Sequence, residues 1–322
     1  MNTKRTIATS ICIGSMLGES SLMFGQVEAV AGVNYQQVAT LKWYPAIQTG
    51  TNTFALGNTP EGVAFDGANI WVSNVNSSTV TKLRAADGAN LGTFSAGSFP
   101  MGMVFDGANI WVADQNNNVS ELQASTGATL GTFNAGTGPT GLAFDGANVW
   151  VTNLFSNNVT KLQASTGANL GTFAVGVGPT AAAFDGVNVW VVNAGSNTVT
   201  KLRAATGAIV GTFNVGGEPF GVAFDGSNIW VTNQGAATVT KLRAADGANL
   251  GTFAVGGSPR GLAFDGANIW VANETNNTVT KLRAADGANL GTFAAGTSPF
   301  GVAFDGANIW VANAGSNTVS KL

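Results

Sequence analysis

Residues 60–97 read PEGVAFDGANIWVSNVNSSTVTKLRAADGANLGTFSAG, and close copies of this stretch follow one another to the end of the 322-residue chain. Successive copies of its Phe-Asp-Gly tripeptide lie 40, 39, 40, 40, 40 and 40 residues apart. They begin at Phe65, Phe105, Phe144, Phe184, Phe224, Phe264 and Phe304. A fixed period in this range indicates a repeat architecture in which every copy forms the same supersecondary unit. We therefore expect seven equivalent units.

Each unit contains four short runs rich in Val, Ile, Phe, Thr and Trp, separated by Asp-Gly, Asn-rich and Gly-Pro segments, a pattern typical of strands and tight turns. In the first copy the expected strands are residues 62–65, 70–74, 79–84 and 91–96. Ile70 and Val72 face one side of the second strand and Trp71 the other, so both faces of each sheet need cover. The sequence therefore predicts an all-β fold, a seven-bladed β-propeller of four-stranded blades of about 40 residues.

The two ends of the repeat region fit a closed ring. The seventh copy stops at Leu322, after its third strand, while residues 53–57 resemble the missing fourth strand. We expect this N-terminal strand to complete the seventh blade, so that the propeller spans residues 51–322 and has no open edge around the ring. Residues 32–50 form a lead-in segment. Within it, residues 38–42 resemble a third strand, which indicates either an additional outer strand or an incomplete C-terminus.

The N-terminus has the features of a secretory signal. Lys4 and Arg5 precede an apolar run at residues 7–17, and Ala29-Val30-Ala31 forms a small-x-small cleavage site. Residues 1–31 are therefore predicted to be a signal peptide, which implies a secreted, periplasmic or cell-surface protein. The alternative is a disordered or peripheral extension. Cleavage would remove Cys12, the one cysteine, and no segment is long and apolar enough to anchor the chain in a membrane.

The composition excludes several function classes. The chain has a formal net charge of −3, and its 14 basic residues are spread along its length, so nucleic acid is not expected as a partner. It contains no histidine, which excludes Ser-His-Asp, Cys-His and His-based zinc sites. Catalysis would have to use carboxylates, Lys, Arg, Tyr or amides. A monomer is expected.

The second and third strands of several copies resemble a known family. Residues 150–153 and 230–233 read WVTN, and each is followed by an NNV or ATV segment and then by TKL, which resembles bacterial YVTN-type propeller repeats. The seven copies also resemble NHL-type and streptogramin (virginiamycin B) lyase-like propellers. The resemblance covers roughly residues 51–322 and implies their fold, whereas propeller families include both binding modules and enzymes. Streptogramin lyases rely on active-site histidines beside a magnesium site, and this sequence has none.

Residues present in every copy are most simply explained by the blade itself. The tryptophans of the second strand, which could be imagined as a carbohydrate platform, are expected to form the core. They are Trp71, Trp111, Trp150, Trp190, Trp230, Trp270 and Trp310. The aspartates of the Phe-Asp-Gly turns are expected to cap those turns rather than to form a calcium ring. The Asn or Asp that closes each second strand is expected to stabilise the hairpin.

Function is best sought where the copies differ, on the loops around one mouth of the channel. After an invariant proline the residues are Glu61, Met101, Thr140, Thr180, Phe220, Arg260 and Phe300. The loops after the second strands add Asp114, Gln115, Leu154, Phe155, Gln234 and Glu274. A few polar groups beside aromatic side chains are typical of a ligand site, although drift on loop tips also predicts variability. The candidate binding residues are Glu61, Met101, Asp114, Phe220, Arg260, Glu274 and Phe300.

Two main functional hypotheses follow, and a third remains open. The first is an exported binding scaffold whose channel mouth holds a protein, peptide or glycan. The second is a metal-assisted lyase or hydrolase, similar to streptogramin lyases or gluconolactonases, in which Glu61, Asp114 and Glu274 hold Ca²⁺ or Mg²⁺ as the only cofactor the sequence suggests. The third is a structural repeat protein of an envelope or matrix.

Overall fold

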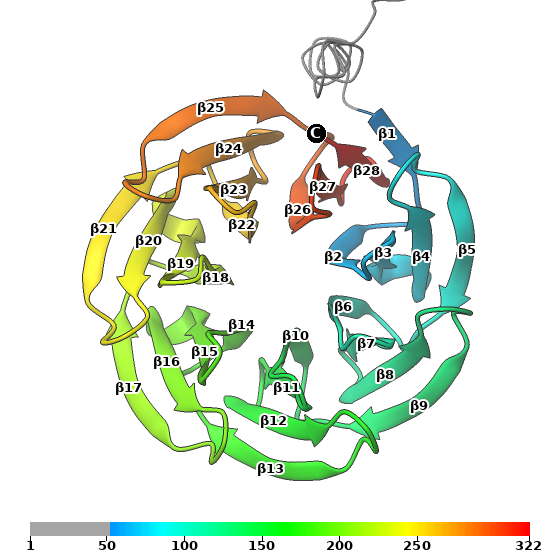
Figure 1. Cartoon of the computed structure of the whole chain (residues 1–322), viewed down its shortest axis with the longest axis horizontal. Helices are drawn as coiled ribbons and strands as arrows, with labels where there is room; N and C mark the ends of the chain where they lie inside the picture. The colour runs from blue at the N-terminus through cyan, green and yellow to red at the C-terminus, as the bar shows by residue number, and fades with distance from the viewer. Residues whose placement is uncertain (1–51) are drawn as a thin grey trace, which may run out of the picture. The chain divides into compact units, whose positions relative to one another are not determined.

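The computed structural model describes residues 52–322, which fold into seven four-stranded antiparallel sheets arranged around a central channel (Figure 1). The all-β, seven-bladed propeller predicted from the repeat is confirmed. Within these residues the helical segments are the single 3₁₀ turns η1 (Val75–Ser77), η2 (Ala194–Ser196) and η3 (Gln234–Ala236). The predicted signal peptide at residues 1–31 and the lead-in segment at 32–50, including residues 38–42, lie outside the described residues.

The blades follow the order of the copies in the sequence. Blade 1 consists of β2 (Pro60–Phe65), β3 (Asn69–Asn74), β4 (Thr79–Arg84) and β5 (Asn90–Ser95). Blade 2 consists of β6 (Pro100–Phe105), β7 (Asn109–Asp114), β8 (Asn118–Gln123) and β9 (Thr129–Asn134). Blade 3 consists of β10 (Pro139–Phe144), β11 (Asn148–Asn153), β12 (Asn158–Gln163) and β13 (Asn169–Ala174). Blade 4 consists of β14 (Pro179–Phe184), β15 (Asn188–Asn193), β16 (Thr198–Arg203) and β17 (Ile209–Asn214).

The last three blades repeat this arrangement. Blade 5 consists of β18 (Pro219–Phe224), β19 (Asn228–Asn233), β20 (Thr238–Arg243) and β21 (Asn249–Ala254). Blade 6 consists of β22 (Pro259–Phe264), β23 (Asn268–Asn273), β24 (Thr278–Arg283) and β25 (Asn289–Ala294). Blade 7 consists of β26 (Pro299–Phe304), β27 (Ile309–Asn313), β28 (Thr318–Lys321) and β1 (Asn52–Ala55).

The innermost strands begin earlier than expected. In blade 1 the strand starts at Pro60, where it pairs with Asn74, rather than at Gly62, and a register shift separates Pro60 from Val63. A proline is tolerated there because the first residue of a strand on a free edge does not need to donate to the ladder. The early start places the residue after each proline on a strand, at the rim of the channel.

Each Phe-Asp-Gly turn is held by its aspartate. In blade 1, Asp66 Oδ1 accepts hydrogen bonds from the backbone N–H groups of Ala68 and Asn69, at 2.9 and 2.6 Å. Its other oxygen, Oδ2, accepts a 2.8 Å hydrogen bond from Trp71 Nε1. The same tryptophan bond recurs in all seven blades. These aspartates therefore cap turns and satisfy the polar atom of a buried ring.

The core lies between neighbouring blades. Trp71 is fully buried and packs with Ile110, Val112 and Leu122 of blade 2. All seven second-strand tryptophans are at most 8% exposed, and each stacks or tilts against a phenylalanine of an outer strand, as Trp71 does with Phe94 at 5.6 Å. Burial of about 150–250 Å² for each aromatic ring makes this repeated position a main source of stability.

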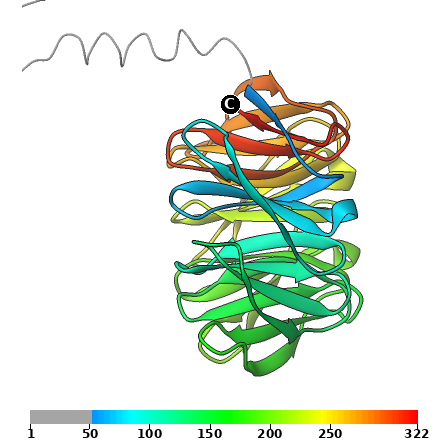
Figure 2. The same ribbon diagram turned by 90° about the vertical axis from the view of Figure 1, so that its right-hand side faces the viewer.

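The ring is closed by the N-terminal strand, as the sequence predicts. β1 pairs antiparallel with β28, with Phe54 opposite Val319 and Asn52 opposite Lys321. Phe54 stacks on Trp310 at 5.5 Å, which is the contact that Phe94 makes with Trp71 in blade 1. Residues from the two ends of the described chain thus complete one blade, as the side view of the ring also shows (Figure 2).

Candidate functional site

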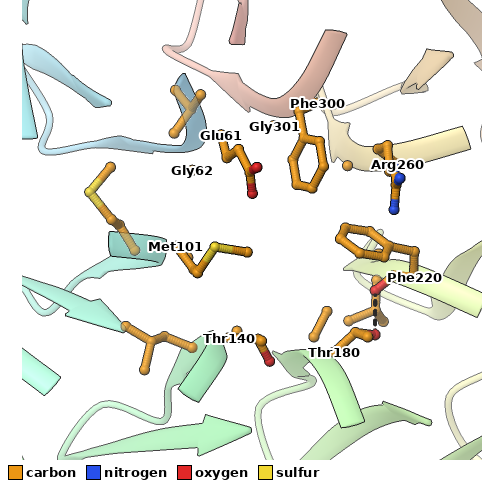
Figure 3. A pocket seen from close by; sticks show the side chains of 18 of the residues that line it. Glu61, Gly62, Met101, Thr140, Thr180, Phe220, Arg260, Phe300 and Gly301 are labelled. Carbon is orange, nitrogen blue, oxygen red and sulfur yellow. Dashed lines mark hydrogen bonds between the residues drawn. The ribbon is translucent and has the colours of Figure 1, made fainter. Parts of the chain in front are cut away.

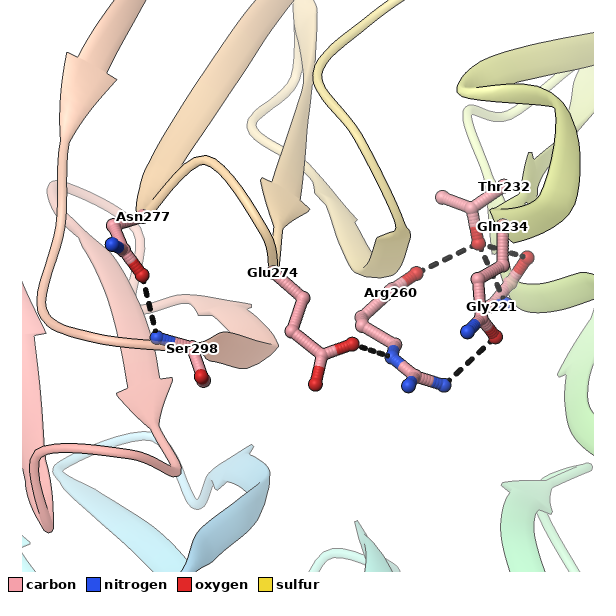
Figure 4. Close-up of polar contacts among 7 residues, drawn as sticks. All are labelled: Gly221, Thr232, Gln234, Arg260, Glu274, Asn277 and Ser298. Carbon is pink, nitrogen blue, oxygen red and sulfur yellow. Dashed lines mark hydrogen bonds and ion pairs between the residues drawn. The ribbon is translucent and has the colours of Figure 1, made fainter.

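The innermost strands lie very close to one another around the channel. A Cβ built on Gly221 in β18 would lie 2.6 Å from the carbonyl oxygen of Arg260 in β22. Thr232 in β19 links the same strands, because its hydroxyl accepts from Gly221 N at 2.8 Å and donates to Arg260 O at 2.7 Å (Figure 4). These bonds fix the backbone of the residue after the proline, so its side chain projects into the channel from a rigid strand.

The seven residues that follow the prolines line one cavity of about 390 Å³ (Figure 3). They are Glu61, Met101, Thr140, Thr180, Phe220, Arg260 and Phe300. Gln115 and Leu154 from the neighbouring loops also line it, whereas Phe155 is not among the lining residues and is 68% exposed. The seven variable positions after the prolines therefore share one cavity at the channel mouth, which we call the mouth cavity, whereas Gln234 and Glu274 are not among its lining residues.

Arg260 is held by partners from two blades. Its Nε donates to Glu274 Oε2 at 2.6 Å, and one terminal nitrogen donates to Gln234 Oε1 at 2.9 Å (Figure 4). The ion pair is partly shielded from water, with side-chain exposures of 18% for Arg260 and 28% for Glu274. Because Glu274 neutralises it, Arg260 adds no net charge to the mouth.

Two phenylalanines pack on the same guanidinium group. The Arg260 carbon Cζ lies 4.8 Å from the ring centre of Phe220 and 5.1 Å from that of Phe300. The two rings contact each other edge to face, with centres 5.2 Å apart. Cation–π contacts of this kind favour a fixed orientation of the guanidinium plane. Phe220, Arg260 and Phe300 thus form one rigid wall of the mouth cavity.

Glu61 projects into the mouth cavity beside Met101 and next to Phe300, one of the two rings of that wall (Figure 3). Its Oε2 atom is buried and has no hydrogen-bond partner. Burial raises the pKa of Glu61 from 4.5 to about 7, while the nearby Arg260 charge lowers it and Glu274 raises it. Glu61 is therefore the one unpaired carboxyl in the lining, and its charge changes near neutral pH.

Asp114 does not join the mouth cavity. It lines a separate hollow of about 320 Å³ together with residues of the loop at 95–98. It is 1% exposed, and burial raises its pKa from 3.8 to about 6. Among residues 52–322, no three His, Cys, Asp or Glu side chains are close enough to hold one metal ion together. The predicted metal set of Glu61, Asp114 and Glu274 is thus not assembled, because Asp114 ends a strand whose last side chain packs against the incoming loop.

The structure shows that further residues, which the differences among the seven copies did not single out, also shape the site. Thr232 and its blade 1 counterpart Ser73 position the neighbouring inner strand, since Ser73 Oγ accepts from Gly62 N and donates to Met101 O. Met103, two residues beyond Met101 on the same strand, also lines the mouth cavity. Because side chains two residues apart on a strand face the same side, Met103 could have been expected to line the channel below Met101.

Comparisons with known proteins support the fold. No model of a protein family matches the sequence, and no curated protein matches it. Among solved structures, the chain is similar to a Kuenenia stuttgartiensis hydrazine synthase chain at 18% identity and a TM-score of 0.73, over 85% of this chain and 98% of that one. It is also similar to a streptogramin B lyase at 16% identity and a TM-score of 0.73, over 84% and 96%. The chain therefore has a streptogramin lyase-like propeller fold.

No helix within the described part of the chain has the length and hydropathy needed to cross a bilayer.

Proposed function

We propose that the protein is a binding module that holds its ligand in the mouth cavity. The observation that carries this proposal is that the seven positions after the prolines, which differ from copy to copy, converge on one cavity and leave Glu61 there without a partner. Residues fixed by the blade are repeated in every copy, whereas these seven positions carry Glu, Met, Thr, Phe and Arg, a mixture of polar and apolar side chains that suits contacts to one ligand. A cavity of this size lies within the usual range for small-ligand sites, about 300–1,000 Å³.

The charges of the mouth cavity favour an amine with an apolar body. Arg260 and Glu274 neutralise each other, so the mouth cavity carries a net negative charge when Glu61 is ionised. Met101, Phe220 and Phe300 supply apolar surface around it. A lysine side chain or amino terminus of a peptide has this chemistry, since a protonated amine would donate to the free carboxylate oxygen of Glu61.

Calorimetry with n-hexylamine and n-hexanol tests this proposal. Both probes have the same apolar body, so the amine is expected to bind about 10- to 100-fold more tightly, as is typical of a charge-assisted hydrogen bond. Glu61→Gln keeps the shape of the side chain and should remove the preference for the amine. Equal binding of the two probes to the wild-type protein, or an unchanged preference in Glu61→Gln, would contradict the proposal.

A second candidate function is catalysis by proton transfer, which rests on the same carboxyl. A group whose pKa is near 7 suits general acid–base work, and the fold is shared with a streptogramin B lyase. If Ca²⁺ or Mg²⁺ takes part at the mouth cavity, it would have to use Glu61 and Glu274 without Asp114. Consumption of a streptogramin B by the wild-type protein but not by Glu61→Gln, followed by liquid chromatography with mass spectrometry, would support catalysis. If the protein consumes no streptogramin B with or without Mg²⁺, the hypothesis that it is a streptogramin B lyase is wrong.

We further propose that the chain is exported, as a YVTN- or NHL-type repeat protein with a cleaved leader. Lys4, Arg5 and the Ala29-Val30-Ala31 segment support this proposal. Mass spectrometry of the protein from its natural source should find an N-terminus at Gly32. An intact N-terminus would instead support a retained extension. The structural-repeat alternative predicts ordered assemblies in the electron microscope and no response to amine probes.

A further inference from the structure

Blade 2 differs from the other six blades at the residue that ends its second strand and in the length of the loop that follows. The second strand ends with Asp114, where the other blades have Asn74, Asn153, Asn193, Asn233, Asn273 and Asn313. The loop that follows is one residue shorter than in the other copies, which accounts for the single spacing of 39. The repeat therefore supplies six internal controls for this site.

The position is built for an amide. In blade 5, Asn233 Nδ2 donates to the hydroxyls of Thr238 and Thr240 at 3.0 and 2.9 Å, and Oδ1 accepts from Gly216 N at 3.0 Å. A carboxylate in the same place has no N–H group to donate to those hydroxyls. The blade 2 position is thus suited to a side chain that donates hydrogen bonds, yet it holds one that only accepts them.

One oxygen of Asp114 has no partner; the same is true of Asn74 Oδ1 and Asn193 Oδ1 in blades 1 and 4, but only Asp114 can carry a charge. Ser120 donates its hydroxyl to Asp114 Oδ2 at 2.6 Å, but Oδ1 has no hydrogen-bond partner. The residue is 1% exposed, and no Lys or Arg contributes to its electrostatic environment. Because burial raises its pKa only to about 6, the carboxyl is mostly ionised at neutral pH. An isolated buried charge is costly unless a cation or several donors offset it.

The hollow beside Asp114 is lined by oxygen-bearing side chains. Besides alanine and glycine, its lining consists of Ser95, Ser98, Asp114, Asn116, Asn118, Ser120, Thr129 and Thr132. In blade 1 the longer loop places Ser77 Oγ 2.8 Å from Asn58 N, and four other blades make the same contact through a Ser or Asn side chain. Blade 2 lacks a residue at that point, so the space stays open.

We propose that this hollow binds a hard cation of the Ca²⁺ class, held by Asp114 and by the amide and hydroxyl oxygens around it. Ca²⁺ takes six to eight oxygen ligands, and Asn116 and Asn118 can turn their amide oxygens toward it. With a single carboxylate the affinity should be weak, of the order of 10⁻⁴–10⁻³ M, as in extracellular calcium modules. The ion offsets a charge that no lysine or arginine offsets, so its binding stabilises blade 2 and the entering loop at residues 95–98.

Asp114→Asn tests the proposal, because it restores the residue that six blades already carry. Thermal unfolding of the full chain is followed in EDTA and with CaCl₂ up to about 10 mM, at constant ionic strength. In the wild-type protein the midpoint temperature should rise by about 2–4 °C when Ca²⁺ is in tenfold excess over its Kd. Asp114→Asn should show no rise. Glu61→Gln should keep the full response, which separates this hollow from the mouth cavity.

Equilibrium dialysis with CaCl₂ provides a second readout that does not depend on stability. One ion per chain on the wild-type protein and none on Asp114→Asn is the expected result. An equal rise in unfolding temperature in both proteins, equal dialysis occupancy, or no response of the wild-type protein up to about 10 mM CaCl₂ would overturn the proposal. The last outcome would mean that ordered water, and no cation, forms hydrogen bonds with Asp114 in this hollow.

Discussion

Arg260 Nε lies 2.6 Å from Glu274 Oε2 and joins the strand β22 to the loop that follows β23. The two residues are 14 positions apart in the chain, the pair is partly buried, and the Arg260 guanidinium packs on Phe220 and Phe300. This ion pair determines the charge of the mouth cavity, because it neutralises Arg260 and leaves Glu61 as the carboxyl whose state depends on pH.

Replacing Arg260 should raise the pKa of Glu61. In Arg260→Met a side chain of similar length remains, but the positive charge that lowers the pKa of Glu61 is lost. We expect the pKa to move above its wild-type value of about 7, as measured by ¹³C NMR titration of the side-chain carboxyl. An unchanged titration curve would show that the Arg260 charge has no measurable electrostatic effect on the pKa of Glu61.

Replacing Glu274 should move the same pKa in the opposite direction. The Glu274 charge raises the pKa of Glu61, so Glu274→Gln is expected to lower it. The amide can still accept a hydrogen bond from Arg260, which keeps the wall of the mouth cavity in place. The same NMR titration measures the change, and a rise in the pKa would contradict a repulsion between the Glu274 and Glu61 carboxylates.

Stability should fall as the pH rises above about 5. The fold raises the pKa values of Asp114 and Glu61 to about 6 and about 7, so between pH 4 and 7 the folded state binds more protons than the unfolded state. Protonation in that range therefore favours folding, and for Asp114 alone the full effect is roughly 3 kcal/mol. Below about pH 4 the turn aspartates, whose pKa values are lowered, lose their stabilising effect.

Urea unfolding in EDTA across this pH range measures the effect. The wild-type protein should be most stable near pH 5, on the balance of these two groups of carboxyls. The double variant Glu61→Gln/Asp114→Asn should lose the decline between pH 5 and 8 and keep the loss below pH 4. A decline of equal size in the double variant would assign the effect to other groups.

Gly221→Ala should destabilise the ring. Its Cβ would lie 2.6 Å from the Arg260 carbonyl oxygen, so β18 and β22 would have to move apart, at a cost of about 1–3 kcal/mol. Gly217→Ala is the matched control, because no atom lies within 4 Å of its Cβ position. Urea unfolding compares the two variants. If both had the same stability, the close approach of the strands would not limit this position.

Glu121→Lys should stabilise the junction between blades 2 and 3. In blade 1 the corresponding Lys82 donates to Ala124 O at 2.6 Å and lies 5.1 Å over the Trp71 ring. Glu121 makes neither contact, and its pKa is raised by burial and by the Asp106 charge. A lysine there should recover the repeated contacts, with a gain of about 1 kcal/mol in the free energy of unfolding. Glu121→Gln removes the charge alone and separates repulsion from the gained contacts.

The sequence alone determined the fold because the information is local and repeated. Alternating apolar residues specify each strand, Asp-Gly pairs specify the turns, and seven copies at one period leave few arrangements that cover both faces of every sheet. The residues at 53–57 also identified the strand that closes the ring. The sequence likewise indicated which positions lie near the channel mouth, because equivalent loops of successive blades follow one another around the ring in chain order.

Only the tertiary structure decided which of the variable side chains meet. Glu61 follows a proline on an inner strand and faces the mouth cavity, whereas Asp114 ends a second strand, pairs with Pro100 and packs against Gly97 between blades. Arg260 and Glu274 pair because the strand and the loop that carry them are adjacent in space. Side-chain direction at a strand end and the distance between loops depend on twist and packing around the whole ring, and no local pattern of residues encodes them.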